Sequence, residues 1–267
     1  MGSGRLLWAK LACLPFTCCN PAAPKPMTTT TTISAKGARG RPRIFLFDID
    51  GTLLTADGAG KRALTLALDH VFGRPNAVDG IDFRGMTDTL IIEQALSRWQ
   101  SSVQSTEIDE VFTIYLEHLK QELVASHSAR ALPGVAELLE RLLALNGPVA
   151  IGLGTGNIEP AAYLKLARVG LNHYFTFGGF GSDHRVRSEI IRVGAERGSS
   201  RLGFALSDCD VIVIGDTFHD VDAALAMGAR AVAVGTSGVA LEALVARGAS
   251  YAFATLQDSQ VLSALLE

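Results

Sequence analysis

Cysteine is scarce in the sequence and is not arranged in pairs. Three of the four cysteines lie among the first 19 residues, and only Cys209 lies in the rest of the chain. Small disulfide-stabilised domains need several cysteines at short, regular spacings, which this sequence does not contain. We therefore expect a fold without disulfides in a reducing compartment, and we predict a cytoplasmic location.

Long apolar runs are also missing near the N-terminus. Residues 6–16 are largely apolar, but Lys10 and Pro15 interrupt them. A helix needs about 20 consecutive apolar residues to cross a bilayer. We expect no interaction with a membrane.

Acidic residues are absent from the first 43 positions, which carry seven Lys and Arg, five prolines and a run of five threonines. A segment of this composition buries too little apolar surface to fold. We predict that residues 1–42 form a disordered basic tail. An organelle-targeting segment and a start codon assigned upstream of a true start at Met27 are the alternatives.

The rest of the chain has the opposite charge balance, with 17 basic and 27 acidic residues and a net charge of −10. Proteins that bind nucleic acids normally present a basic face. This balance argues against a nucleic-acid partner, and we expect a small-molecule partner instead. We expect a monomer or a homodimer.

Residues 44–52 are the most informative stretch, with the sequence Ile-Phe-Leu-Phe-Asp-Ile-Asp-Gly-Thr. The apolar run is typical of a strand buried on both faces, as in parallel sheets. Asp48 and Asp50 fall at its C-terminal end, where ligands bind in open α/β sheets. Carboxylates at such a position are costly unless they bind a cation or take part in chemistry.

Helical spacing of apolar residues dominates residues 56–130, and strands alternate with helices afterwards. The alternation predicts a Rossmann-like α/β fold, a parallel sheet with helices on both faces. Further strands are expected at 148–152, 174–177, 211–214 and 231–234. Helices are expected at 62–72, 89–99, 107–124, 134–145, 160–169, 187–197, 221–227, 241–246 and after 256.

Two further strand ends carry polar residues. Thr155-Gly156-Asn157 follow one strand, and Asp216 and Asp220 follow another. Because the carboxyl ends of parallel strands lie at one edge of the sheet, these groups should meet Asp48 and Asp50. Each pattern alone is also typical of a turn or a helix cap.

This set of residues predicts phosphoryl transfer to a carboxylate. An aspartate can attack phosphorus and form an aspartyl phosphate, which divides a difficult hydrolysis into two steps. A phosphate dianion repels a carboxylate, so a cation is needed, and Mg²⁺ suits oxygen ligands such as Asp48 and Asp216. The Thr155 hydroxyl and the amides at Thr155 and Gly156 would hold other phosphate oxygens.

Asp48-Ile49-Asp50-Gly51-Thr52 resembles the first motif, DxDGT, of the haloacid dehalogenase-like (HAD) hydrolases. Thr155-Gly156-Asn157 is similar to the second motif, and Gly215 to Asp220 is similar to the fourth motif, GDxxxD. The motifs follow in the same order, and the resemblance covers about residues 43–267. It implies a HAD fold with a small helical cap domain inserted after the first strand.

The resemblance also implies roles for single residues. Asp48 would be the nucleophile, and Asp50 would act first as general acid and then as general base. The Mg²⁺ would be held by Asp48, the Asp50 backbone carbonyl and Asp216, with Asp220 orienting the metal shell. An acid at position 50 is typical of the phosphatases and not of the dehalogenases. The residues expected to bind or position the phosphate are Gly51, Thr155, Gly156 and Asn157.

The third motif departs from the common pattern, because its Lys-Pro pair is absent. The segment Gly179 to Arg187 is similar to a subgroup in which an Arg at the start of a helix replaces the lysine. We predict that Arg187 neutralises the phosphate and the nucleophile, with Arg185 as the alternative.

The helical insert resembles the cap of phosphoglycolate phosphatase-like HAD enzymes. Such a cap closes over a small substrate and excludes water. Arg84, in a loop expected to face the active site, could bind a substrate carboxylate or second phosphate. A salt-bridged residue of the cap surface is the alternative interpretation.

We therefore expect a catalytic core of residues 43–55 and 131–267 and a helical cap of residues 56–130. The predicted function is Mg²⁺-dependent hydrolysis of a small phosphorylated metabolite, a phosphoglycolate-like phosphomonoester, through an aspartyl phosphate. The alternatives are a phosphomutase of the β-phosphoglucomutase type and a non-catalytic HAD-fold binding or regulatory protein.

Overall fold

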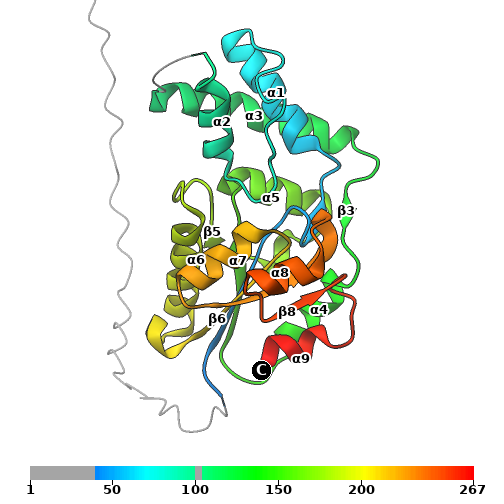
Figure 1. Cartoon of the computed structure of the whole chain (residues 1–267), viewed down its shortest axis with the longest axis vertical. Coiled ribbons are helices and arrows are strands. Elements are labelled where there is room, and N and C mark those ends of the chain that lie inside the picture. Colours follow the sequence, from blue (N-terminus) through cyan, green and yellow to red (C-terminus); the bar gives the residue numbers. More distant parts are fainter. Residues whose placement is uncertain (1–39, 100–103) are drawn as a thin grey trace, which may run out of the picture. The chain divides into compact units, whose positions relative to one another are not determined.

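A computed structural model describes residues 40–99 and 104–267 (Figure 1). The predicted basic tail lies almost entirely outside these residues. In the two described segments, no helix is long and apolar enough to cross a membrane.

The first predicted strand lies in the middle of a six-stranded sheet. Strand β1 (Arg43–Phe47) pairs in parallel with β4 (Val149–Gly154) on one side and with β6 (Asp210–Gly215) on the other. The order is β5-β4-β1-β6-β7-β8, and every pairing is parallel. The remaining strands are β5 (Gly178–Gly179), β7 (Arg230–Val234) and β8 (Tyr251–Phe253).

Helices cover both faces of this sheet, which confirms the predicted α/β class (Figure 1). Successive side chains of a strand point to opposite faces. Accordingly, Phe45 and Phe47 pack on one face with α4, α5 and α9, and Ile44 and Leu46 pack on the other with α6, α7 and α8. The bounds are α4 (Val135–Leu143), α5 (Glu159–Arg168), α6 (Arg187–Leu202), α7 (Phe218–Ala226), α8 (Leu241–Arg247) and α9 (Val261–Leu266).

The strand predicted at 174–177 is wrong. A 3-10 helix occupies Asn172–Tyr174, and the strand follows at Gly178–Gly179. Two aromatic residues of the predicted strand, Phe175 and Phe177, are buried, and Phe175 lies edge-on against Phe47. The strand itself consists of glycine because α6 passes very close: a Cβ at Gly179 would lie 1.9 Å from the Ile190 carbonyl oxygen.

A helical insert leaves the core after a short strand and returns through another. Strand β2 (Leu54–Thr55) pairs antiparallel with β3 (Arg130–Ala131), so the two connections lie side by side. Between them lie α1, α2 and α3, beyond the carboxyl ends of the main sheet (Figure 1), and we call these helices with their loops the cap. The bounds are α1 (Ala59–Phe72), α2 (Asp88–Leu96) and α3 (Ser105–Ala125).

Candidate active site

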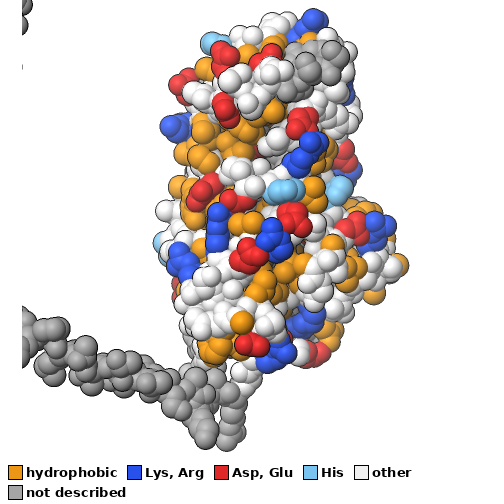
Figure 2. Space-filling view, turned by 90° about the vertical axis from the view of Figure 1, so that its left-hand side faces the viewer, with side chains coloured by type: hydrophobic (Ala, Val, Ile, Leu, Met, Phe, Trp, Pro, Cys, Tyr) orange, Lys and Arg blue, Asp and Glu red, His pale blue; other side chains and the backbone are white. Residues whose placement is uncertain are grey.

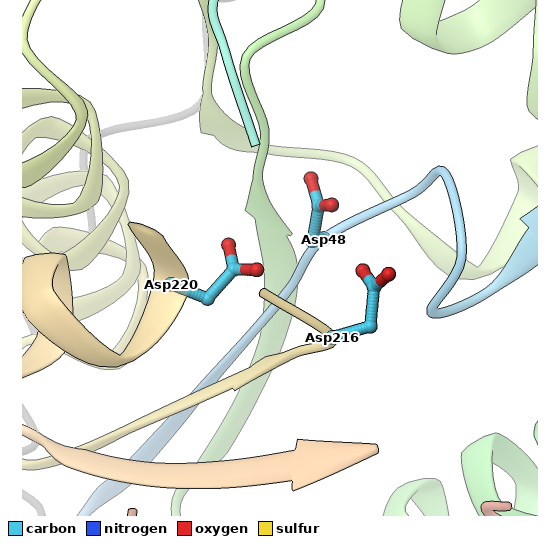
Figure 3. Close-up of side chains that lie close together, drawn as sticks. All are labelled: Asp48, Asp216 and Asp220. Carbon is cyan, nitrogen blue, oxygen red and sulfur yellow. The ribbon is translucent and has the colours of Figure 1, made fainter. Parts of the chain in front are cut away.

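Three buried carboxylates meet at the carboxyl edge of the sheet. Asp48 follows β1, Asp216 follows β6, and Asp220 lies in the first turn of α7. Oxygen atoms of all three lie within 4.8 Å of one another. Figure 3 shows the three side chains reaching toward a common space from these separate elements.

The electrostatics of this cluster fit a divalent cation. Burial raises the pKa of Asp48 to about 6, against the opposing effect of the Arg187 charge. Burial, followed by repulsion from Asp48 and Asp220, raises the pKa of Asp216 to about 8. A cation would relieve this repulsion, and three carboxylates are the hard oxygen donors that Mg²⁺ prefers. The Asp50 side chain is not part of the cluster.

The turn after β1 lies in close contact with the Asp216 carboxylate. Gly51 has φ +85°, and a Cβ on it would lie 2.3 Å from Asp216 Oδ2. Only glycine suits this conformation and this approach. The Thr52 hydroxyl donates a hydrogen bond of 3.1 Å to Asp216 Oδ1. The DGT sequence therefore holds the Asp216 carboxylate in place.

Of the two arginines considered for the third motif, the structure places Arg187 in the site. Its Nη2 lies 2.8 Å from Asp48 Oδ1 and 2.5 Å from Asp220 Oδ1, and its side chain is 8% exposed. Although burial opposes the charge, the two carboxylates keep the pKa of Arg187 above its usual value. Arg185 instead forms an exposed ion pair of 2.7 Å with Glu93 of the cap.

Asp220 links the helix α7 to the site. It accepts hydrogen bonds from the Thr217 backbone N–H at 3.0 Å and from the Thr217 hydroxyl at 2.8 Å, which caps the helix. Together with the bonds from Arg187, these contacts fix its carboxylate. The arrangement suits the predicted role of orienting the metal shell.

Asp50 has a buried partner that the sequence analysis missed. Its Oδ2 accepts hydrogen bonds from Asn157 Nδ2 at 2.9 Å and from Lys165 Nζ at 2.6 Å. Lys165 also donates to Asn157 Oδ1 at 2.6 Å, and its side chain is 6% exposed. Helical spacing could have indicated this, because Lys165 follows the buried Ala161 and Ala162 by four and three positions.

The predicted phosphate loop is fixed by its own hydrogen bonds and by the cap. The Thr155 hydroxyl is fully buried and accepts a hydrogen bond of 2.9 Å from Asn157 Nδ2, so the structure does not place it on the cavity surface. A Cβ on Gly156 would lie 2.2 Å from the Met86 carbonyl oxygen of the cap. The Asp88 N–H donates to the Gly156 carbonyl oxygen at 2.9 Å.

Arg84 forms an ion pair with Asp82 of the same loop. Its guanidinium donates two hydrogen bonds to Asp82, from Nε at 2.9 Å and from Nη2 at 2.6 Å. The hydrogen bonds from Arg84 lower the pKa of Asp82 to about 2. This geometry favours the alternative interpretation of Arg84 as a salt-bridged residue of the cap surface, although its side chain also borders the cavity.

A cavity of about 300 Å³ lies between the cap and the carboxyl edge of the sheet. Its core side presents Asp48, Asp50 and Arg187, and its cap side presents Lys61, Leu64 and Phe83. The cavity therefore brings the nucleophile candidate together with a cap wall that carries apolar side chains and the Lys61 ammonium, in a space that suits a small molecule.

Comparison with known proteins agrees with this geometry. The family model described as haloacid dehalogenase-like hydrolase matches residues 45–234. No curated protein matches the chain. Among solved structures, a hydrolase from Pseudomonas syringae is 21% identical, with 81% of this chain and 95% of that chain covered and a TM-score of 0.57.

Two further solved structures are similar in fold. A protein from Haemophilus somnus, described as a predicted phosphoglycolate phosphatase, is 16% identical with a TM-score of 0.60, and 84% of this chain and 98% of that chain are covered. CbbY from Rhodobacter sphaeroides, solved in complex with phosphate, is 14% identical with a TM-score of 0.63. The match covers 84% of this chain and 99% of that chain. Since the family match spans β1 through β7, with the three clustered aspartates and the helical insert between them, this chain belongs to the haloacid dehalogenase-like hydrolases.

Proposed function

We propose that this protein is a Mg²⁺-dependent phosphatase of small phosphomonoesters. The observation that carries the proposal is the position of Asp48. Its carboxylate faces the cavity, 2.8 Å from the Arg187 guanidinium and within the carboxylate cluster. A carboxylate so placed can attack phosphorus while neighbouring cations offset the charge of the phosphate.

Each residue of the site then has a task. Asp48 forms the bond to phosphorus, and Asp50, which lines the same cavity, protonates the leaving oxygen and later takes a proton from water. Arg187 offsets negative charge on Asp48 and on the transferred phosphoryl group. A bound Mg²⁺, held by Asp48, Asp216 and the Asp50 carbonyl oxygen, would supply further charge neutralisation. The cap excludes bulk water.

The size and lining of the cavity favour a substrate whose leaving group is small and negatively charged. Its volume of about 300 Å³ leaves room for a few carbon atoms beyond the phosphate. The Lys61 ammonium lies 5.5 Å from the centre of the Phe83 ring. In residues 40–99 and 104–267 it forms no ion pair, whereas Arg84 is neutralised by Asp82. A substrate carboxylate beside Lys61, as in phosphoglycolate, suits this wall.

The surface supports a small-molecule partner over a nucleic acid. On the face shown in Figure 2, basic and acidic side chains are interspersed. Nucleic-acid binding would instead favour a continuous basic area.

The test is an assay of the purified protein with and without Mg²⁺, using phosphoglycolate, p-nitrophenyl phosphate and β-glucose 1-phosphate. The proposal predicts Mg²⁺-dependent release of inorganic phosphate from the first two. Conversion of glucose 1-phosphate to an isomeric phosphate without release would establish the mutase alternative. No turnover of any ester with Mg²⁺ would contradict the proposal and favour a non-catalytic role.

A further inference from the structure

Lys165 is a buried cation outside the motifs that carry the proposed reaction. It lies on α5, two helical turns after Asn157, and its side chain is 6% exposed. Its ammonium contacts Asp50 Oδ2 and Asn157 Oδ1, both at 2.6 Å. Taking an ammonium group out of water is costly unless hydrogen bonds and an opposite charge compensate. Here the groups that compensate the ammonium, the Asp50 carboxylate and the Asn157 amide oxygen, belong to residues that line the cavity.

The same contacts determine how the Asp50 carboxylate is held. Oδ2 receives two hydrogen bonds, from Lys165 and from Asn157 Nδ2. Across the described residues, Oδ1 receives no hydrogen bond from another side chain, and Asp50 borders the cavity. Asn157 is itself fixed by the Thr155 hydroxyl. One oxygen of Asp50 is thus anchored while the carboxylate as a whole remains accessible.

We propose that Lys165 is a positioning residue for the acid–base carboxyl group of Asp50. By holding Oδ2 it leaves Oδ1 to face the leaving oxygen of the substrate. This inference rests on the proposed phosphatase function. Without Lys165, the Asn157 amide is the one side chain of the described residues that still bonds the Asp50 carboxylate, and the carboxyl group samples orientations that cannot transfer a proton.

Leaving groups of different basicity separate this role from a merely structural one. p-Nitrophenolate is a stable anion and leaves without a proton, whereas the alkoxide of phosphoglycolate needs one from a general acid. The quantity kcat/KM covers the steps up to formation of the phosphoenzyme, so it reports proton transfer to the leaving group. General acid catalysis contributes roughly 100-fold or more.

The experiment compares Lys165→Met with the wild type on both esters in the presence of Mg²⁺. We expect kcat/KM for phosphoglycolate to fall by about 100-fold and that for p-nitrophenyl phosphate by less than about tenfold. Arg168→Met is the matched control. Arg168 lies on the same helix and bonds the Leu123 and Ser126 carbonyl oxygens of the cap, away from Asp50. Replacing Arg168 should change kcat/KM for both esters by the same factor.

Equal losses on the two esters in Lys165→Met would overturn the inference while leaving the phosphatase proposal intact. No turnover by the wild type would reject both. Thermal unfolding of each variant shows whether it is folded. If Lys165→Met does not fold, Lys165→Leu, which likewise cannot donate a hydrogen bond to Asp50, must show the same selective loss.

Discussion

Arg187 Nη2 lies 2.8 Å from Asp48 Oδ1, although Asp48 follows the first strand of the sheet and Arg187 begins α6. Both side chains are buried, so removing the cation leaves an uncompensated carboxylate, at a cost of about 3–5 kcal/mol. We expect Arg187→Ala to lower kcat/KM by at least about 100-fold. Arg185→Ala, which breaks only an exposed pair with Glu93, should change it by less than about threefold. Steady-state kinetics of the two variants test this, and the reverse order would assign the third motif to Arg185.

Magnesium binding should release a proton at neutral pH. In the metal-free site, burial and repulsion among the carboxylates raise the pKa values of the coupled groups Asp216 and Asp48 well above the usual range, so the pair together retains a proton near neutral pH. A carboxylate ligand must lose its proton, so we expect roughly one proton released per Mg²⁺ at pH 7 and weaker binding as the pH falls. Calorimetric titration in two buffers of different ionisation enthalpy measures this number. A value of zero at pH 7 would show that Asp216 is already ionised or does not bind the metal.

The stability of the metal-free protein should depend on pH through Asp88. Burial raises the pKa of this carboxyl group to about 6, and its Oδ2 accepts a hydrogen bond from the Ile158 N–H. Between about pH 4 and 6, Asp88 is protonated in the folded state but ionised in the unfolded state. Its contribution to the free energy of unfolding is therefore fully present below about pH 4 and is lost as the pH rises through about 6.

The variant Asp88→Asn keeps an acceptor but cannot ionise. Its free energy of unfolding should therefore equal that of the wild type near pH 4 and exceed it by about 3 kcal/mol at pH 7. Urea unfolding of both proteins across this range, without metal, measures the difference. A difference that does not vary with pH would mean that Asp88 does not titrate in this window.

Lys61 should contribute more to the selection of anionic substrates than Arg84. We expect the wild type to prefer phosphoglycolate over 2-hydroxyethyl phosphate, which lacks the carboxylate. Lys61→Met should reduce this ratio of kcat/KM values by about tenfold. Arg84→Met should reduce it by less than about threefold, because Asp82 already neutralises the charge of Arg84 in the wild type. A larger effect of Arg84→Met would restore Arg84 as the residue that binds the carboxylate.

Local patterns in the sequence were sufficient to predict strands β1, β4, β6 and β7 and the edge of the sheet at which Asp48, Asp216 and Asp220 meet, whereas β5 was expected too early in the chain and β8 was not predicted. Buried strands and terminal aspartates have strong signals, and parallel topology brings their ends together. Lys165 escaped notice because a lysine on a helix is normally exposed. Only the fold shows that its ammonium reaches Asp50.

Tertiary packing also explains one wrong strand and one choice between interpretations that the sequence left open. The aromatic residues at 174–177 suggested a strand because β propensity reflects burial, but Phe175 is buried against Phe47 from an irregular segment. The role of Arg84 depended on Asp82, two residues away, and no spacing rule predicts that loop geometry.

The central claim is that Asp48 attacks phosphorus, and Asp48→Asn tests it most directly. The measurement is Mg²⁺-dependent phosphate release from p-nitrophenyl phosphate, with Asp222→Asn as the control, since Asp222 lies at the surface in an ion pair with Arg247. We expect a loss of at least about 1,000-fold for Asp48→Asn, because an amide is a poor nucleophile and a poor metal ligand, and near wild-type activity for the control. Activity of Asp48→Asn within about tenfold of the wild type would show that phosphoryl transfer does not pass through Asp48.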